Sequence, residues 1–212
     1  SANFAAICIT PTPETSPTMG YTDLVINGVA NVPQTSGNLD DGGWGNLPLG
    51  FGFDFFGTNF STINVGTNGV LQFGTYNGTA LQDFTIGALP NLVDPLAAIF
   101  ASAGDLRIGG ATGYNGNLRY WTAGAAPNRK FILDYQGYRY GNSSQNVKFQ
   151  VVIYETIGQV DVIVLENAAG NNKTIGINSP SGTIGAAAPN CAAVPNTPGY
   201  WQATINTIPA SS

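Results

Sequence analysis

The chain has 212 residues and a formal net charge of −5, with only 9 % of its residues charged and no His, whereas ordinary soluble proteins are about 25 % charged. A hydrophobic content of 43 % argues against a disordered chain. The seven Lys and Arg residues are scattered and form no basic patch for nucleic acid, and no run of about 18 apolar residues predicts a membrane span.

Residues 1–20 are predicted to form an extended arm, and residues 21–212 a single domain. The segment 4–9 is apolar and typical of a strand. Regular structure is not expected after it, because Pro removes a backbone donor and fixes φ at Pro11, Pro13 and Pro17. Since residue 1 is Ser rather than Met, we expect the numbering to start at a processed mature end.

The most regular pattern lies in residues 47–74. Large apolar residues alternate there with small or polar ones, which predicts a strand with one buried face: Leu49, Phe51, Phe53 and Phe55 against Gly50, Gly52 and Asp54. Gly57-Thr58-Asn59 predicts a turn. The Asn68-Gly69 pair predicts a tight hairpin between strands at 63–65 and 70–73.

Further short strands are predicted along the rest of the chain, with loops at 31–46 and 75–94. They are expected at 21–27, 96–101, 106–108, 118–122, 129–135, 147–155, 159–166, 173–177 and 200–208. Turn signals recur about every 8 to 12 residues, and no amphipathic helix stands out. This predicts an all-β fold, an antiparallel β-sandwich of jelly-roll or immunoglobulin-like two-sheet architecture.

Several segments carry a family pattern. Residues 47–74 read LPLGFGFDFFGTNFSTINVGTNGVLQFG, and residues 174–183 read TIGINSPSGT. Together with 89–100, 131–135 and 148–164, they resemble nidogen-like β-sandwich modules of secreted bacterial surface proteins, notably of Bacteroidetes-type organisms. The resemblance implies a sandwich fold and an extracellular location. Relatives often have Trp-Asp-Asp-Leu where this chain has Ala-Ser-Ala-Gly-Asp-Leu at 101–106, so an acidic role of that loop is not carried over.

The chain has two cysteines, Cys8 and Cys191, near its opposite ends. In an oxidising compartment they are expected to form a disulfide that fastens the arm to a C-terminal loop. The alternative is two buried free thiols. A zinc site is not expected, because two thiols without any His leave too few ligands.

Candidate chemistry is sparse. A catalytic triad needs a base, usually His, and the chain has none, so we expect neither an enzyme nor a cofactor. Asp40 and Asp41, followed by two glycines, are a candidate calcium site, because Ca²⁺ prefers oxygen ligands on flexible loops. The alternative there is a plain turn.

Aromatic residues offer a candidate glycan platform, formed by Trp44, Tyr138 and Tyr140. In an all-β fold such residues also serve as core or edge packing, and the sequence leaves both readings open.

Two functions compete. The first is an extracellular structural subunit that assembles with itself into a surface fibre. A terminal strand would complete the sheet of a neighbour, with Phe4, Ala6, Ile7 and Ile9 as candidate exchanged residues. The second is a secreted adhesive or carbohydrate-binding module whose partners are glycans or other cell-surface proteins.

Overall fold

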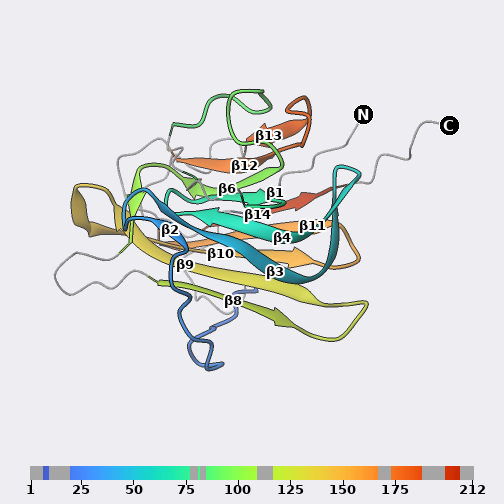
Figure 1. Ribbon diagram of the computed structural model, residues 1–212, viewed down its shortest axis with the longest axis horizontal. Helices are drawn as coiled ribbons and strands as arrows, with labels where there is room; N and C mark the ends of the chain where they lie inside the picture. The colour runs from blue at the N-terminus through green and yellow to red at the C-terminus, as the bar shows by residue number, and fades with distance from the viewer. Residues whose placement is uncertain are drawn as a thin grey trace.

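Two antiparallel β-sheets form the fold of the computed structural model (Figure 1). The structure describes residues 7–9, 20–76, 81, 85–108, 117–166, 173–187 and 199–205. Sheet A contains, in spatial order, β1 (Ile7–Ile9), β14 (Gly199–Thr204), β11 (Gln159–Glu166), β10 (Asn142–Tyr154), β9 (Lys130–Arg139) and β7 (Leu106–Arg107), and β8 (Asn117–Ala123) also pairs with β9.

Sheet B is the second layer. Its spatial order is β13 (Gly185–Ala187), β12 (Thr174–Asn178), β6 (Ala98–Ala103), β5 (Val70–Phe73), β4 (Thr58–Gly66), β3 (Gly42–Phe55) and β2 (Ser36–Gly37). All strand pairs are antiparallel. No helix occurs among the described residues. The predicted all-β sandwich is therefore confirmed, while the division into an arm and a domain stays a prediction.

Strand β3 shows how the sequence builds the apolar face of sheet B. Leu49, Phe53 and Phe55 are buried, and the glycines between them are exposed, as the alternation predicts. The strand is longer than expected, because it begins at Gly42 inside the segment predicted as a loop. Gly43 and Trp44 are held there by pairing with Gly66 and Val65 of β4, a long-range contact that local sequence does not reveal.

The predicted hairpin at Asn68-Gly69 is confirmed between β4 and β5. Gly69 has φ +78°, and a Cβ at this position would lie 2.9 Å from the carbonyl oxygen of Ala101. Both facts require glycine. The turn between β3 and β4 falls on Phe56-Gly57, with φ of 51° and 80°, slightly earlier than the predicted Gly57-Thr58-Asn59.

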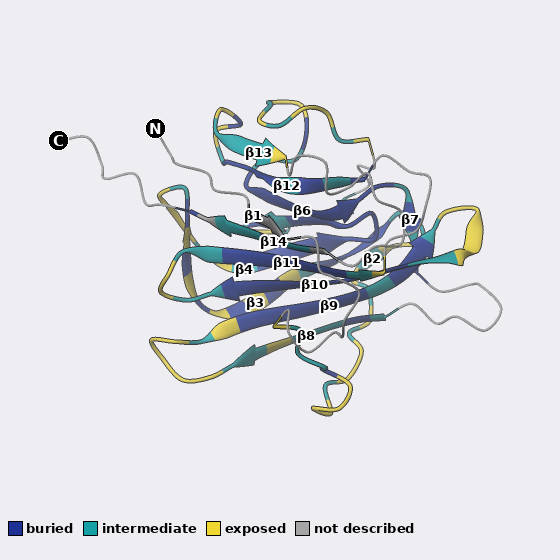
Figure 2. Ribbon diagram, turned by 180° about the vertical axis from the view of Figure 1, so that it is seen from behind, coloured by how far each residue is buried: buried dark blue, intermediate teal, exposed yellow. Residues whose placement is uncertain are grey.

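The main core fills the space between the sheets, and buried residues run along the central strands (Figure 2). The ring of Tyr135 on β9 stacks on Phe149 of β10, with centroids 4.5 Å apart. The rings of Phe53 and Phe73, from β3 and β5, stack at 5.6 Å. These contacts bury large aromatic surfaces, which provide most of the favourable free energy of such a core.

Residues 21–29, called the strap below, lie on the outer face of sheet A. The predicted strand at 21–27 is wrong, because the Asp23 carboxylate accepts hydrogen bonds from the backbone N–H groups of Val25 and Ile26 and turns the chain. Leu24 is fully buried against Ile132, Val152 and Ile163, which form a second apolar cluster. The strap is thus packed against sheet A through Leu24.

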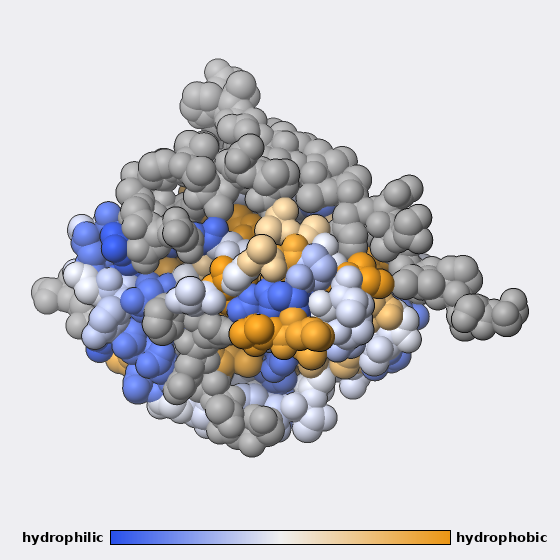
Figure 3. Space-filling view, turned by 90° about the horizontal axis from the view of Figure 1, so that it is seen from above, coloured by the Kyte–Doolittle hydropathy of each residue, from blue (hydrophilic) through white to orange (hydrophobic). Residues whose placement is uncertain are grey.

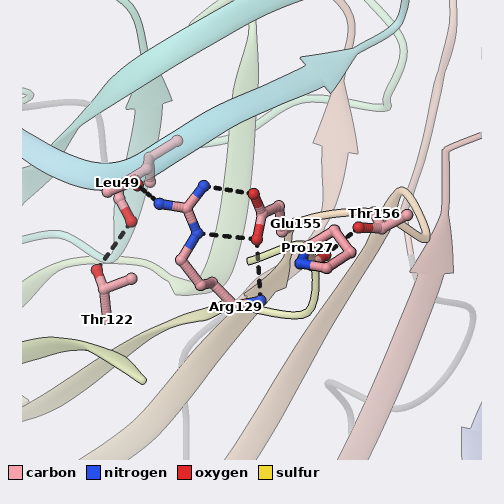
Figure 4. A network of polar contacts seen from close by, with 7 residues as sticks. Leu49, Thr122, Pro127, Arg129, Glu155 and Thr156 are labelled. Carbon is pink, nitrogen blue, oxygen red and sulfur yellow. Dashed lines mark hydrogen bonds and ion pairs between the residues drawn. The ribbon is translucent and has the colours of Figure 1, made fainter. Parts of the chain in front are cut away.

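A polar network joins the two sheets near the turn between β8 and β9 (Figure 4). Arg129 donates from Nε to Glu155 Oε2 at 2.9 Å and from Nη2 to Glu155 Oε1, and its Nη1 donates to the Gly50 carbonyl oxygen in sheet B. Thr122 Oγ1 donates to the neighbouring Leu49 carbonyl oxygen at 2.8 Å. Paired, hydrogen-bonded charges of this kind fix how the layers meet.

Candidate functional site

The predicted glycan platform does not assemble on the surface. Trp44 is only 1 % exposed, and its indole N–H donates to the Val32 carbonyl oxygen at 2.8 Å. Tyr138 is also buried, whereas Tyr140 is 47 % exposed. Trp44 is drawn into the core because its large ring gains more from burial there, with its one donor satisfied. Tyr140 is the one member that can present a ring to a ligand.

Asp40 and Asp41 lie in a hydrogen-bonded turn. The Asn38 side-chain oxygen accepts both of their backbone N–H groups, at 2.7 and 2.9 Å. Burial, followed by the charges of Asp41 and Asp105, raises the pKa of Asp40. Within the described ranges, no group of three or more His, Cys, Asp or Glu side chains has a geometry that could hold a metal ion. The calcium hypothesis therefore gains no support from this turn.

Only part of the predicted arm falls within the described residues. Ile7, Cys8 and Ile9 form β1, in which Cys8 is the cross-strand partner of Trp201. Phe4, Ala6 and Cys191 lie outside the described residues. The disulfide and the exchange of a terminal strand both stay predictions. β1 itself pairs within its own chain, at the edge of sheet A.

One end of the sandwich collects an unusual share of the charge. We call it the charged end; it comprises residues 38–41, 104–107, 138–145 and Lys173. It contains three of the chain's seven Lys and Arg residues together with three carboxylates: Arg107, Arg139, Lys173, Asp40, Asp41 and Asp105. Figure 2 shows β7 beside the exposed tip of the β9–β10 hairpin at this end.

Backbone pairing brings these segments together. Leu106 is the cross-strand partner of Arg139, and the Tyr140 N–H donates to the Asp105 carbonyl oxygen at 3.0 Å. The Ile108 N–H donates to the Leu39 carbonyl oxygen at 2.8 Å, which ties in the turn of Asp40 and Asp41. The charged end is therefore built by loops and strand ends at one end of the two sheets, and loops on a sheet scaffold commonly form binding sites.

The charges of this end influence one another without direct pairing. Burial and then Asp41 raise the pKa of Asp105, while the nearby Arg139 acts in the opposite direction. Burial and then Arg139 lower the pKa of Lys173 to about 8. In the part of the chain that the structure describes, the one ion pair joins Arg129 to Glu155 at a different place. Among the described residues, none of the six groups therefore forms an ion pair within the chain.

Lys173 was not singled out from the sequence, although a signal is present. Lys173, Ile175 and Ile177 follow the two-residue period of a strand, and the two isoleucines belong to the core. The same period places Lys173 on the inner side of sheet B, where it is 4 % exposed. A Lys at an inward position of a predicted strand is rare enough to mark a site.

A family profile described as NIDO related matches residues 14–212. The chain belongs to the NIDO-related family. This extends the resemblance seen at 47–185 over almost the whole chain. No match was found among curated proteins or among solved structures.

This NIDO-related chain also has an exposed apolar tip. Leu92 is 70 % and Val93 is 93 % exposed, and Figure 3 shows apolar atoms gathered on the face seen from above. The turn is well fixed, because the Asn91 side-chain oxygen accepts the N–H groups of Val93 and Asp94, and Asn178 Nδ2 donates to the Asn91 carbonyl oxygen at 3.0 Å. No helix among the described residues is long and apolar enough to cross a membrane.

Proposed function

We propose that this NIDO-related chain is an extracellular adhesive module that binds a glycan at the charged end. NIDO-related modules are generally extracellular, which supports secretion. We also infer a bacterial surface setting of the Bacteroidetes type from the resemblance of residues 47–185. Binding without catalysis is the expected mode, because the chain has no His to serve as a general base at neutral pH.

The half-exposed ring of Tyr140 beside unpaired charges is the observation that carries this proposal. An aromatic ring offers an apolar face to the C–H side of a sugar, while its hydroxyl stays in water. Sugar hydroxyls donate to carboxylates such as Asp105 and accept from cations such as Arg139. A few polar groups converging around an aromatic surface are typical of small-ligand sites.

A glycan array compares the wild type with two matched variants. Tyr140→Ala removes the exposed ring at the charged end, and Trp121→Ala removes a ring on β8 that is similarly exposed, at 39 %. We expect array signals for the wild type and for Trp121→Ala, and at least about a tenfold loss of affinity, or about 1.4 kcal/mol, for Tyr140→Ala. An array without hits, or equal loss in both variants, would contradict the proposal.

A fibre-forming subunit is the second candidate. One observation favours it: sheet A ends in β1, a strand of three residues that pairs on one side with β14. Edge strands of this kind can accept or donate a strand between copies. Deleting residues 1–10 should then abolish fibres, seen by negative-stain microscopy of the intact protein, while the domain stays folded. Fibres formed by the truncated chain would exclude an exchange of this arm.

A further inference from the structure

The amine of Lys173 is buried without a hydrogen-bond partner. The residue is 4 % exposed, and its Nζ has no hydrogen-bond acceptor among the residues that the structure describes. Buried polar atoms in folded proteins are almost always paired, and a buried cation normally faces an anion. The buried ammonium group is therefore left with its hydrogen-bond donors free for an anion.

A second cation faces the same space from the opposite sheet. On β9, Arg139 continues the inward series of Phe131, Leu133 and Tyr135, all of which lie in the main core. Among the described residues, Arg139 donates one side-chain hydrogen bond, from Nη1 to the side-chain oxygen of Gln145 at the long distance of 3.3 Å. Most of the guanidinium donors are thus left for another acceptor.

The backbone explains why the two cations meet. Thr174, next to Lys173, is the cross-strand partner of Ala103 at the end of β6 in sheet B. After Gly104 and Asp105 the chain crosses to sheet A, where Leu106 pairs with Arg139. Lys173 and Arg139 therefore lie on the two sides of one short crossing. Burial, and after it the positive charge of Arg139, lowers the pKa of Lys173.

We propose that Lys173 and Arg139 form an oxyanion site between the sheets at the charged end, and that its ligand is the carboxylate or sulfate group of an acidic sugar. The identification of the ligand as a sugar rests on the proposed glycan-binding function. The existence of the anion site is independent of that function. A buried ammonium group near a guanidinium group is stabilised by an anion that contacts both. The Arg fork matches two oxygens at once, and the Lys ammonium supplies a point charge.

Neighbouring groups suit the remainder of such a sugar. The Tyr140 N–H donates to the Asp105 carbonyl oxygen at 3.0 Å, so the backbones of the two residues are held next to each other. The Asp105 carboxylate would repel a bare anion but accept hydrogen bonds from sugar hydroxyls. The site therefore favours an anion that carries hydroxyl groups over inorganic sulfate or phosphate.

The test measures binding of three probes to the intact chain at constant ionic strength: glucuronate, inorganic sulfate and neutral glucose. Melting temperature reports affinity, and backbone amide shifts in ¹⁵N NMR spectra report the place of binding. The variants are Lys173→Met and Arg139→Gln. Lys130→Met is the control, because Lys130 is exposed and its Nζ lies over the ring of Tyr154, 4.9 Å from the centroid.

We expect glucuronate to raise the melting temperature more than glucose and to shift the amides of Thr174 and Tyr140. Lys173→Met and Arg139→Gln should each weaken binding at least about tenfold, and Lys130→Met should not. Lys173→Met removes a buried unpaired charge, so this variant should fold. If Arg139→Gln misfolds, the binding by Lys173→Met and the amide shifts still test whether the anion site exists. If sulfate binds and glucuronate does not, the anion site is confirmed, but its ligand is not an acidic sugar.

Two outcomes overturn the inference. One is the absence of amide shifts at Thr174 and Tyr140 with both anions. The other is equal binding of glucuronate by the wild type and Lys173→Met. These outcomes differ from failure of the proposed function. If the array shows binding of a neutral glycan and Tyr140→Ala loses that binding, the adhesive function stands and the anion site is excluded. If the chain binds an anion at this site but no glycan on the array, the anion site stands and the glycan-binding function is excluded.

Discussion

The side chain of Gln150 and the backbone of Thr22 exchange two hydrogen bonds across 128 residues of sequence. The Thr22 N–H donates to Gln150 Oε1 at 2.9 Å, and Gln150 Nε2 donates to the Thr22 carbonyl oxygen at 2.8 Å. The amide thus imitates one residue of a β-ladder and holds the strap to the outer face of sheet A. Gln150 is fully buried and Thr22 is half-buried, so both bonds are partly shielded from competing water.

Gln150→Ala should detach the strap. The change removes both hydrogen bonds and leaves the Thr22 groups unpaired, at a cost of roughly 2 kcal/mol in the free energy of unfolding. Urea unfolding measures this cost, and limited proteolysis should show new cleavage within residues 21–29. Gln136→Ala, at a half-buried position of β9, should change stability by less than about 0.5 kcal/mol. Equal effects of the two changes would refute the role of Gln150.

Asp134 on β9 is the cross-strand partner of Gln150 on β10. Its titration should make the free energy of unfolding fall as pH rises. Its Oδ1 is buried without a partner, and burial raises its pKa to about 6 in spite of Lys148 and Arg119. The native state therefore holds this proton more tightly than the unfolded chain, whose pKa is near 3.8. The contribution is fully present below about pH 4 and is lost as pH passes 6, a change of roughly 2 to 3 kcal/mol.

The difference in unfolding free energy between wild type and Asp134→Asn isolates this effect, because other titrating groups cancel. We expect the difference to favour the wild type progressively as pH is lowered from 7 to 4, measured by urea unfolding at each pH. A difference that stays constant over this range would show that Asp134 is not perturbed.

Glu155 should make stability rise with pH, which is opposite to the effect of Asp134. Its hydrogen bond with Arg129 lowers its pKa to about 2, from 4.5. Because the ionised form is favoured in the native state, the stabilisation is present above about pH 4.5 and is lost as pH falls to 2. Thermal unfolding of Glu155→Gln should show destabilisation at pH 7 that shrinks below pH 4. Glu166→Gln, at an exposed position, serves as control; a pH-independent loss in Glu155→Gln would exclude the ionic explanation.

Lys173→Met should stabilise the chain in the absence of ligand. The pKa of Lys173 is about 8 in the native state and 10.5 in the reference state, so the ammonium form costs stability below pH 8 and the cost disappears as pH rises toward 10.5. At pH 7 the gain should be roughly 2 to 3 kcal/mol, whereas exposed Lys130→Met should change little. Destabilisation by Lys173→Met would mean that the amine has a partner in the free protein.

Local patterns predicted the strands better than the faces on which single residues lie. The alternation from Leu49 to Phe55 and the Asn68-Gly69 hairpin are set by neighbours in sequence, and both were confirmed. The glycine-rich surroundings of Trp44 indicate a loop and leave open whether its ring lies on the surface or in the core. Its burial depends on pairing with Val65, some twenty residues away, which no local pattern contains.

The candidate site shows the same limit. Tyr140 is one of the predicted platform residues, and Arg139 is its neighbour in sequence. Asp105 and Lys173 are distant from both and approach them only through the crossing from β6 to β7. The prediction of a strand at 21–27 is wrong for a different reason. Residues 24–26 are apolar and indicate a strand, and the hydrogen bonds to the Asp23 carboxylate override that preference.

Calorimetric titration of the best array ligand into the wild type, Tyr140→Ala and Trp121→Ala tests the central claim most directly. If the charged end binds the glycan, the wild type and Trp121→Ala will bind with the same affinity, and Tyr140→Ala will bind at least about tenfold more weakly. Unchanged binding by Tyr140→Ala, or a loss confined to Trp121→Ala, would move the site away from the charged end and contradict the account.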